Sequence, residues 1–192
     1  MNCAGEHTWI EPFWVHLDLD VGSLDDARKH LVCRASDMRG YYADAVELER
    51  LIAERSDPVL YEVFEAGVPL QRGHLMYCLS KLYPGTVGQE YFMTKGHYHN
   101  VKATAEVYLC LRGQGYIVLK TSEGRFVAEL MQRGRIVYVP PHWAHRSVNT
   151  SANEPLVSLC VYPAEAGHNY GDIASEGFPK RVFCRDGQCV IE

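Results

Sequence analysis

The stretch Thr94-Lys95-Gly96-His97-Tyr98-His99 gives the first strong indication of fold and chemistry in this 192-residue chain. In a strand, residues i and i+2 point to the same face, so His97 and His99 would project together. Imidazole is the commonest metal ligand in proteins, and two rings on one face suit a single ion. A lone pair of this kind is usually a surface feature, so its meaning depends on the residues that follow.

The residues that follow continue the pattern at regular spacing. Six residues separate His99 from Glu106, which opens a strand-like run. The remaining members of the pattern, in chain order, are Gly113, Gly134, Pro140, His145 and Asn149. Each has an ordinary explanation alone, such as a solvated carboxylate or a loop histidine. The ordered combination is much less expected by chance.

These residues resemble the two motifs of the cupin superfamily, G-x5-H-x-H-x3,4-E-x6-G and G-x5-P-x-G-x2-H-x3-N. The second motif matches, with His142 standing where a Gly is common. The first motif departs in two places. The spacing from His99 to Glu106 is longer, and no Gly stands six residues before His97.

The departures point to one subfamily, because the chain is similar to the cupin-type (archaeal-type) glucose-6-phosphate isomerases, which have the longer spacing. Pro84-Gly85 and the stretches Val137–Arg146 and Tyr162–Gly171 also fit that family. The resemblance runs from about Tyr61 to Phe178. It implies one divalent metal ion per subunit, Fe2+ first, with Mn2+, Ni2+, Co2+ or Zn2+ as alternatives. The implied metal ligands are His97, His99, Glu106 and His145.

The resemblance also implies roles for other residues. Glu106 and His168 would be catalytic, with His168 assisting ring opening. The implied substrate-binding residues are Tyr61, Ser80, Thr94, Gly96, Tyr108 and Tyr162. Ser80 stands where the family usually has Thr, which keeps the hydroxyl. Lys95 would point to the opposite face of a strand and is expected to be solvated, and His142 is expected on the surface.

Isomerisation of an aldose to a ketose moves a hydrogen between C1 and C2. Either a base removes the C2 proton to give a cis-enediol, or a hydride shifts directly while the metal polarises the carbonyl. The sequence leaves both open. We favour the enediol, with Glu106 as base interconverting glucose 6-phosphate and fructose 6-phosphate.

Two other functions fit the same four ligands. One is a metal-dependent cupin dioxygenase, and the other is a non-enzymatic, sugar-binding cupin. The residues Thr94–Gly96 and Ala166–Tyr170 fit sugar-phosphate binding. Oxygenase chemistry does not explain their presence. Loss of metal ligands is common in non-enzymatic cupins, whereas all four are present here.

The many short strands along the chain predict a mainly β protein, either a β-sandwich or a barrel. The resemblance implies a cupin double-stranded β-helix (jelly-roll barrel) with N-terminal helices and strands packed outside. We expect one domain over 1–192, with an extension at 1–60, the barrel at 61–178 and a C-terminal hairpin at 179–192. Helical character is expected at Asp25–His30 and Tyr42–Arg55. The expected strands are Tyr61–Phe64, Leu75–Leu82, Gln89–Thr94, Glu106–Leu111, Tyr116–Lys120, Arg125–Leu130, Ile136–Val139 and Leu156–Tyr162.

The charge and hydrophobicity of the chain disfavour some classes of binding partner. The net charge is −5 and Lys and Arg are scattered, which disfavours nucleic acid as a partner. No apolar run is long enough to cross a membrane. The first fifteen residues contain no Lys or Arg, unlike a secretory signal, so we expect a cytoplasmic protein. The resemblance implies that the partners are a sugar phosphate and a second copy of the chain in a homodimer.

The seven cysteines are expected to be reduced, because their number is odd and the compartment is expected to be reducing. Asp186-Gly187 is a strong hairpin signal, and it would place Cys184 opposite Cys189. A cross-strand disulfide is geometrically conceivable there, although reduced thiols are the favoured interpretation.

Overall fold

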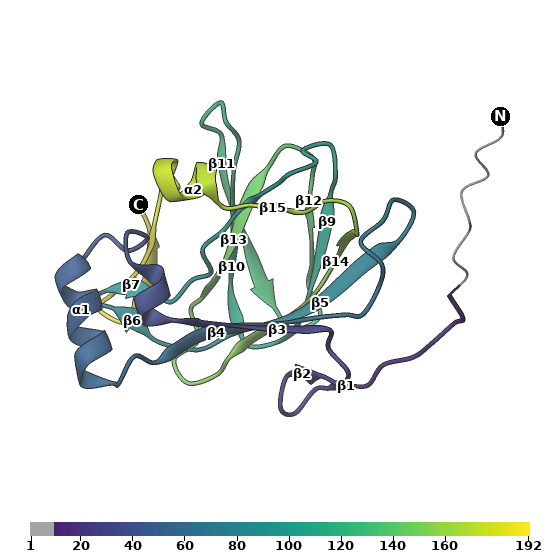
Figure 1. Cartoon of the computed structure of the whole chain (residues 1–192). Helices are drawn as coiled ribbons and strands as arrows, with labels where there is room; N and C mark the ends of the chain where they lie inside the picture. The colour runs from purple at the N-terminus through teal and green to yellow at the C-terminus, as the bar shows by residue number, and fades with distance from the viewer. Residues whose placement is uncertain (1–9) are drawn as a thin grey trace.

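Two antiparallel sheets form the body of the protein, for which the computed structural model describes residues 10–192. Cys3 and His7 lie outside the described residues. The larger sheet has the order β12-β9-β14-β5-β4-β3 and the smaller has the order β11-β10-β13. Figure 1 shows them enclosing a barrel, with the chain from β15 to α2 crossing over it. The predicted jelly-roll fold class is confirmed.

The strands of the larger sheet are β3 (Lys29–Arg34), β4 (Val59–Glu65), β5 (Leu75–Leu82), β9 (Glu106–Arg112), β12 (Ile136–Val139) and β14 (Leu156–Pro163). Those of the smaller sheet are β10 (Gln114–Lys120), β11 (Phe126–Gln132) and β13 (Ala144–Asn149). Short strands complete the fold: β1 (Leu17–Asp18), β2 (Ser23–Leu24), β6 (Thr86–Val87), β7 (Glu90–Tyr91), β8 (Tyr98–His99), β15 (His168–Asn169), β16 (Val182–Arg185) and β17 (Gln188–Ile191).

Alternation along the strands fixes which side chains face the barrel interior. In β9, Glu106, Tyr108 and Cys110 are buried, and the residues between them are less so. In β13 all six residues are buried, so both faces of that strand are covered. Isolated bridges join Met93 to Val148 and His97 to His145. The segment that carries His97 therefore lies directly against β13.

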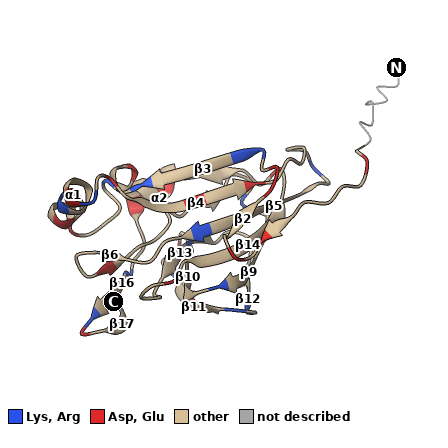
Figure 2. Ribbon diagram, turned by 90° about the horizontal axis from the view of Figure 1, so that it is seen from below, with Lys and Arg blue, Asp and Glu red and all other residues tan. Residues whose placement is uncertain are grey.

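The predicted helix near Tyr42–Arg55 is confirmed as α1 (Ala45–Glu54). It begins at Ala45 because the Asp44 carboxylate accepts a hydrogen bond from the Glu47 N–H at 2.9 Å, which caps the first turn. Leu48 packs into the core while the outer face carries both signs of charge (Figure 2). A short 3-10 helix, η1 (Ala35–Met38), precedes it, and α2 (Gly171–Glu176) lies near the C-terminus.

The predicted helix at Asp25–His30 is wrong. Asp26 adopts a positive φ of 53° in a turn, and Lys29 begins β3. This strand pairs with β4, with Leu31 opposite Val63 and Cys33 opposite Tyr61. Long-range pairing with β4 outweighs the local helical preference. Residues 29–34 thus extend the barrel sheet.

The predicted strands of the barrel are confirmed with small shifts of their ends, with one exception. The run Gln89–Thr94 is a strand only at β7 (Glu90–Tyr91), because Phe92 and the residues after it turn toward β13. Neither β13 nor α2 was predicted from the sequence. No helix within residues 10–192 is long and apolar enough to cross a membrane.

The C-terminal hairpin places Cys184 directly opposite Cys189, as predicted. Asp186 and Gly187 both have positive φ, 51° and 77°, as a tight two-residue turn requires. Both thiols are free, as are the other four cysteines within residues 10–192.

Candidate metal centre and substrate cavity

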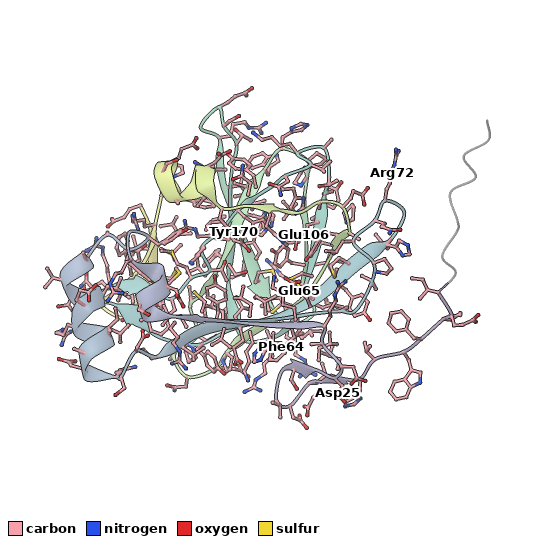
Figure 3. The ribbon with its side chains drawn as sticks, in the orientation of Figure 1. Asp25, Phe64, Glu65, Arg72, Glu106 and Tyr170 are labelled. Carbon is pink, nitrogen blue, oxygen red and sulfur yellow. The ribbon has the colours of Figure 1, made fainter. Side chains whose placement is uncertain are left out.

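Four side chains from three elements converge inside the barrel. His97 and His99 come from the segment around β8, Glu106 opens β9, and His145 lies in β13. One candidate ligand atom from each lies within 4.8 Å of the others. His99, Glu106 and His145 are at most 5% exposed. Figure 3 shows Glu106 between the sheets, at the centre of the barrel. The spacing in the sequence therefore brings these four residues together.

Hydrogen bonds at Nδ1 orient the imidazole rings of His99 and His145. The Nδ1 atom of His99 lies 2.8 Å from Thr104 Oγ1, whose own proton goes to the Val101 carbonyl at 2.7 Å. His99 Nδ1–H is therefore the donor, which leaves His99 Nε2 with a free lone pair. The Nδ1 of His145 lies 3.4 Å from the Trp143 carbonyl, which favours the same tautomer.

The Nε2 atoms meet at the Glu106 carboxylate. Glu106 Oε2 lies 3.0 Å from Nε2 of both His99 and His145. His97 Nε2 is buried without a hydrogen-bond partner among the described residues, and His145 Nε2, although 3.0 Å from Glu106 Oε2, makes no hydrogen bond to it. Three imidazole nitrogens and one carboxylate are a suitable ligand set for a divalent first-row metal. Buried imidazole nitrogens that no protein group satisfies are suited to bind a cation, so the residues fit a metal ion.

The charges in the cluster favour a cation. Burial alone would raise the pKa of Glu106, but the neighbouring His145 and His99 outweigh it and hold that pKa below the usual range. Burial, followed by the neighbouring imidazoles, holds the pKa of His97 well below its usual value. The cluster thus consists of an ionised carboxylate beside at least one neutral imidazole.

A cavity of about 470 Å3 adjoins the cluster. His168 in β15 lines it, and the His168 ring lies 4.4 Å from the ring of His97. Burial lowers the pKa of His168, so its imidazole is neutral at neutral pH. Tyr61 of β4 lines the same cavity, and so does Cys33 of β3. The structure therefore brings Tyr61 and His168 together beside the cluster.

Two further predicted tyrosines lie inside the barrel around the histidines. The Tyr108 ring lies 5.6 Å from that of His145, and the Tyr162 ring lies 5.9 Å from that of His99. Burial raises the pKa of both hydroxyls, Tyr108 also through the nearby charge of Glu106. Both side chains are therefore neutral and able to donate hydrogen bonds.

The residues predicted to hold phosphate are more dispersed. The Thr94 hydroxyl accepts a hydrogen bond from the Ser147 N–H at 3.0 Å, which leaves its own proton to donate. Gly96 has φ of 78°, and a Cβ there would lie 3.0 Å from the Cβ of Arg146. Ser80 is buried in β5 opposite Ser158 and does not line the 470 Å3 cavity.

Sequence reasoning missed two residues that line the cavity, Lys95 and Tyr170. The expectation that Lys95 points away assumed strand alternation, but residues 94–96 are not in a strand and Gly96 has positive φ. The Lys95 ammonium lies 5.7 Å from the Tyr41 ring centre. Tyr170, beside α2, is on the segment that crosses the barrel (Figure 3). Gly96 was the indication in the sequence that strand alternation would not hold at Lys95. His142 is exposed, as expected.

Comparison with known proteins identifies close relatives. A family described as glucose-6-phosphate isomerase (GPI) matches residues 32–192. Glucose-6-phosphate isomerase of Thermococcus litoralis is 47% identical over 184 residues, covering 95% of this chain and 94% of that protein. The enzyme of the same name from Pyrococcus horikoshii is 47% identical over 181 residues, covering 94% of each chain.

Solved structures also match the fold over part of the chain. An oxalate oxidase structure matches with a TM-score of 0.48 and 12% identity, covering 65% of this chain and 62% of that one. A cupin 2 domain-containing protein from Halorhodospira halophila matches with a TM-score of 0.38 and 24% identity, covering 51% and 55%.

Proposed function

Because this chain belongs to the glucose-6-phosphate isomerase family, we propose that it interconverts glucose 6-phosphate and fructose 6-phosphate with one bound divalent metal ion. One observation carries the proposal: three histidines and a glutamate, two of their Nε2 atoms without partners, converge beside a 470 Å3 cavity. That arrangement combines a metal centre with room for a small polar substrate.

The proposed metal ligands are His97, His99, Glu106 and His145, and Fe2+ is the proposed ion, with Mn2+, Ni2+, Co2+ or Zn2+ as substitutes. The choice among first-row ions depends on availability as much as on affinity. When bound, the ion would polarise the substrate oxygens at C1 and C2 and stabilise negative charge that develops on them. The four residues that would hold it lie together within the barrel.

Glu106 is the proposed base for the enediol route. It takes the C2 proton of the open-chain aldose and returns it to C1 of the cis-enediol, while O1 gains a proton and O2 loses its hydroxyl proton, which gives the ketose. The lowered pKa of Glu106 keeps the carboxylate ionised, as a base must be. It also makes Glu106 a weak base, which favours the return of the proton to C1 in the second half of the reaction. Product formed in deuterated water should carry solvent deuterium, whereas a direct hydride shift would leave none.

His168 is proposed to assist ring opening. Its imidazole lines the cavity and is neutral because burial lowers its pKa, so it can accept the proton of the anomeric hydroxyl. Tyr108 and Tyr162 remain protonated and can donate hydrogen bonds to sugar hydroxyls from the barrel interior. These three side chains would hold and open the sugar without a formal charge of their own.

For the phosphate group we propose Tyr61, Ser80, Thr94 and Gly96 as the binding residues, with the oriented hydroxyls and amides supplying hydrogen bonds. Lys95 adds a positive charge at the cavity wall beside Tyr61. This local charge matters because the whole chain carries a net charge of −5. Ser80 has the weakest structural support, since it lies outside the cavity lining.

The proposal also covers the oligomeric state and the cellular location of the protein. We propose a homodimer in the cytoplasm, with each chain a single domain. The N-terminal arm runs away from the barrel (Figure 1), and on it Phe13 and Trp14 are 53% and 86% exposed. Apolar side chains on a projecting arm are suited to burial against a second copy.

A coupled assay tests the function. The purified protein should convert fructose 6-phosphate to glucose 6-phosphate, lose that activity with EDTA, and regain it when the metal is restored. The same preparation should act without oxygen. Oxygen uptake with no anaerobic isomerase activity would instead support the dioxygenase, and protein purified without chelator that holds no metal would support the non-enzymatic sugar-binding module.

A further inference from the structure

Arg146 lies on the opposite side of β13 from the metal cluster. It follows His145 directly, and successive residues of a strand point to opposite faces. Its guanidinium lies 4.1 Å from the centre of the Phe178 ring, in the segment after α2. Lys120 of the paired strand β10 approaches the same ring at 5.9 Å. Two cations therefore gather on this outer face of the barrel.

The Arg146 guanidinium is only 5% exposed and has no carboxylate partner among the described residues. Its Nη1 donates to the Met93 sulfur at 2.8 Å, which is a weak acceptor. Its Nε is buried without any partner. A buried charged group is normally paired and hydrogen-bonded, so this one lacks an anion.

The carboxylates in the neighbourhood already have other partners. Glu90, which is 3% exposed, accepts from Arg181 Nη1 at 2.7 Å and from the Ala43 N–H at 2.9 Å. Glu176 accepts from Lys120 Nζ at 2.8 Å. Two carboxylates therefore face three cations, and the excess positive charge lies at Arg146.

A cavity of about 190 Å3 opens beside this guanidinium. Arg146, Arg181, Tyr41, Ser175 and Glu176 are among its lining residues, and the Glu176 carboxylate is paired with Lys120. Its volume is less than half that of the 470 Å3 cavity proposed for the substrate, so it suits a phosphate group better than a whole sugar phosphate. Tyr41 lies between the two regions, since the Lys95 ammonium that lines the larger cavity lies over its ring.

We propose that this cavity is a second, non-catalytic site for a small oxyanion of the phosphate class, with Arg146 and Arg181 as its charged donors. A guanidinium matches phosphate oxygens in geometry and charge, and burial makes the interaction stronger and less sensitive to salt. The site is distinct from the sugar-phosphate site because His145 and Arg146 face opposite sides of one strand.

Titration calorimetry with inorganic phosphate on the metal-loaded full chain tests the proposal. The wild-type protein should bind two phosphates per chain, one in the substrate cavity and one beside Arg146. Arg146→Met should weaken the second by about 10- to 100-fold, the value of a charge-assisted hydrogen bond. The matched control Arg125→Met removes an exposed arginine that stacks on Trp143, and it should still bind two.

Addition of fructose 6-phosphate identifies the natural source of the anion. If it displaces one phosphate, the second site takes free phosphate, and if it displaces both, the second site takes the phosphate group of a sugar phosphate. One phosphate per wild-type chain, or two per chain in Arg146→Met at unchanged affinity, would overturn the proposal.

Two further measurements do not depend on folding of the Arg146 variant. Arg181→Gln changes the half-exposed rim of the cavity and should weaken the second phosphate by about tenfold. In wild-type crystals soaked in selenate, the anomalous signal should show a selenium atom in the cavity within hydrogen-bond reach of Arg146. A soaked crystal with selenium elsewhere but none in this cavity would contradict the proposal.

Discussion

The two faces of β13 carry opposite chemistry one residue apart. On the inner face His145 joins a cluster whose buried nitrogen lone pairs lack partners, around an ionised carboxylate. On the outer face Arg146 presents a buried Nε–H that lacks an acceptor among the described residues and an Nη1–H whose acceptor is the weak Met93 sulfur. A lone pair without a partner indicates a missing cation, and an N–H without a partner indicates a missing anion. The comparison shows that the kind of unsatisfied buried atom identifies the kind of ligand.

Removal of one metal-ligand residue on the inner face of β13 should abolish the metal-dependent activity. His97→Ala should lower metal-dependent isomerase activity to background, because it removes one of the four ligand atoms and opens the coordination sphere. The matched control His142→Ala changes an exposed histidine of the second motif and should keep full activity and metal content. Metal analysis and the coupled assay measure both variants. Normal activity in His97→Ala would remove the assigned ligand set.

His168 lies on the same side as the metal cluster without belonging to it. His168→Asn should therefore lower kcat by about 10²–10⁴-fold, the usual contribution of a general acid or base. Its metal content should stay unchanged, because the four ligand residues are intact. The same loss of activity accompanied by loss of metal would show that His168 supports the cluster instead.

Thr104 provides a further test of the inner face of β13, because its proposed effect on the metal site passes only through its hydrogen bond to His99. Thr104→Val removes the acceptor that fixes the His99 ring at 2.8 Å, and it should weaken metal affinity by about 10- to 100-fold. Thr104→Ser keeps the hydroxyl and should restore the affinity. Competition with a metal-binding dye measures both. Equal affinity in the two variants would exclude the positioning role.

Gly96 lies between the two faces, against the Cβ of Arg146 and the carbonyl of His145. Gly96→Ala should lower the free energy of unfolding by about 1–2 kcal/mol from its positive φ, and by more from the contacts near 3.0 Å. Gly124→Ala is the control, since its φ of 85° is similar but nothing lies within 4 Å. Denaturant unfolding should show the larger loss at Gly96, and equal losses would mean that the packing around Gly96 yields easily.

Much of the inner site could be predicted from sequence, because strand alternation and ordered spacing act over a few residues. H-x-H places His97 and His99 side by side, and the later motif adds His145 by pairing across the barrel. The six residues between His99 and Glu106 looked like a departure from the general motif. In the structure they contain Thr104, which holds His99.

What could not be predicted depends on contacts between distant parts of the chain. The segment Asp25–His30 has local helical character, yet residues 29–34 pair with β4, and four of them line the 470 Å3 cavity. Lys95 was assigned to solvent because strand alternation was assumed through a segment that turns at Gly96. Arg146 gave no sequence signal, since its isolation follows from Arg181 and Lys120 having taken both nearby carboxylates.

The central claim is that the four inner residues hold a metal ion on which isomerisation depends. The most direct test measures metal content and the conversion of fructose 6-phosphate to glucose 6-phosphate on one preparation, before EDTA, after EDTA and after one equivalent of Fe2+ is added back. We predict about one ion per chain at the start, loss of metal and activity together, and recovery of both. Full isomerase activity in protein shown to contain no metal would contradict the account.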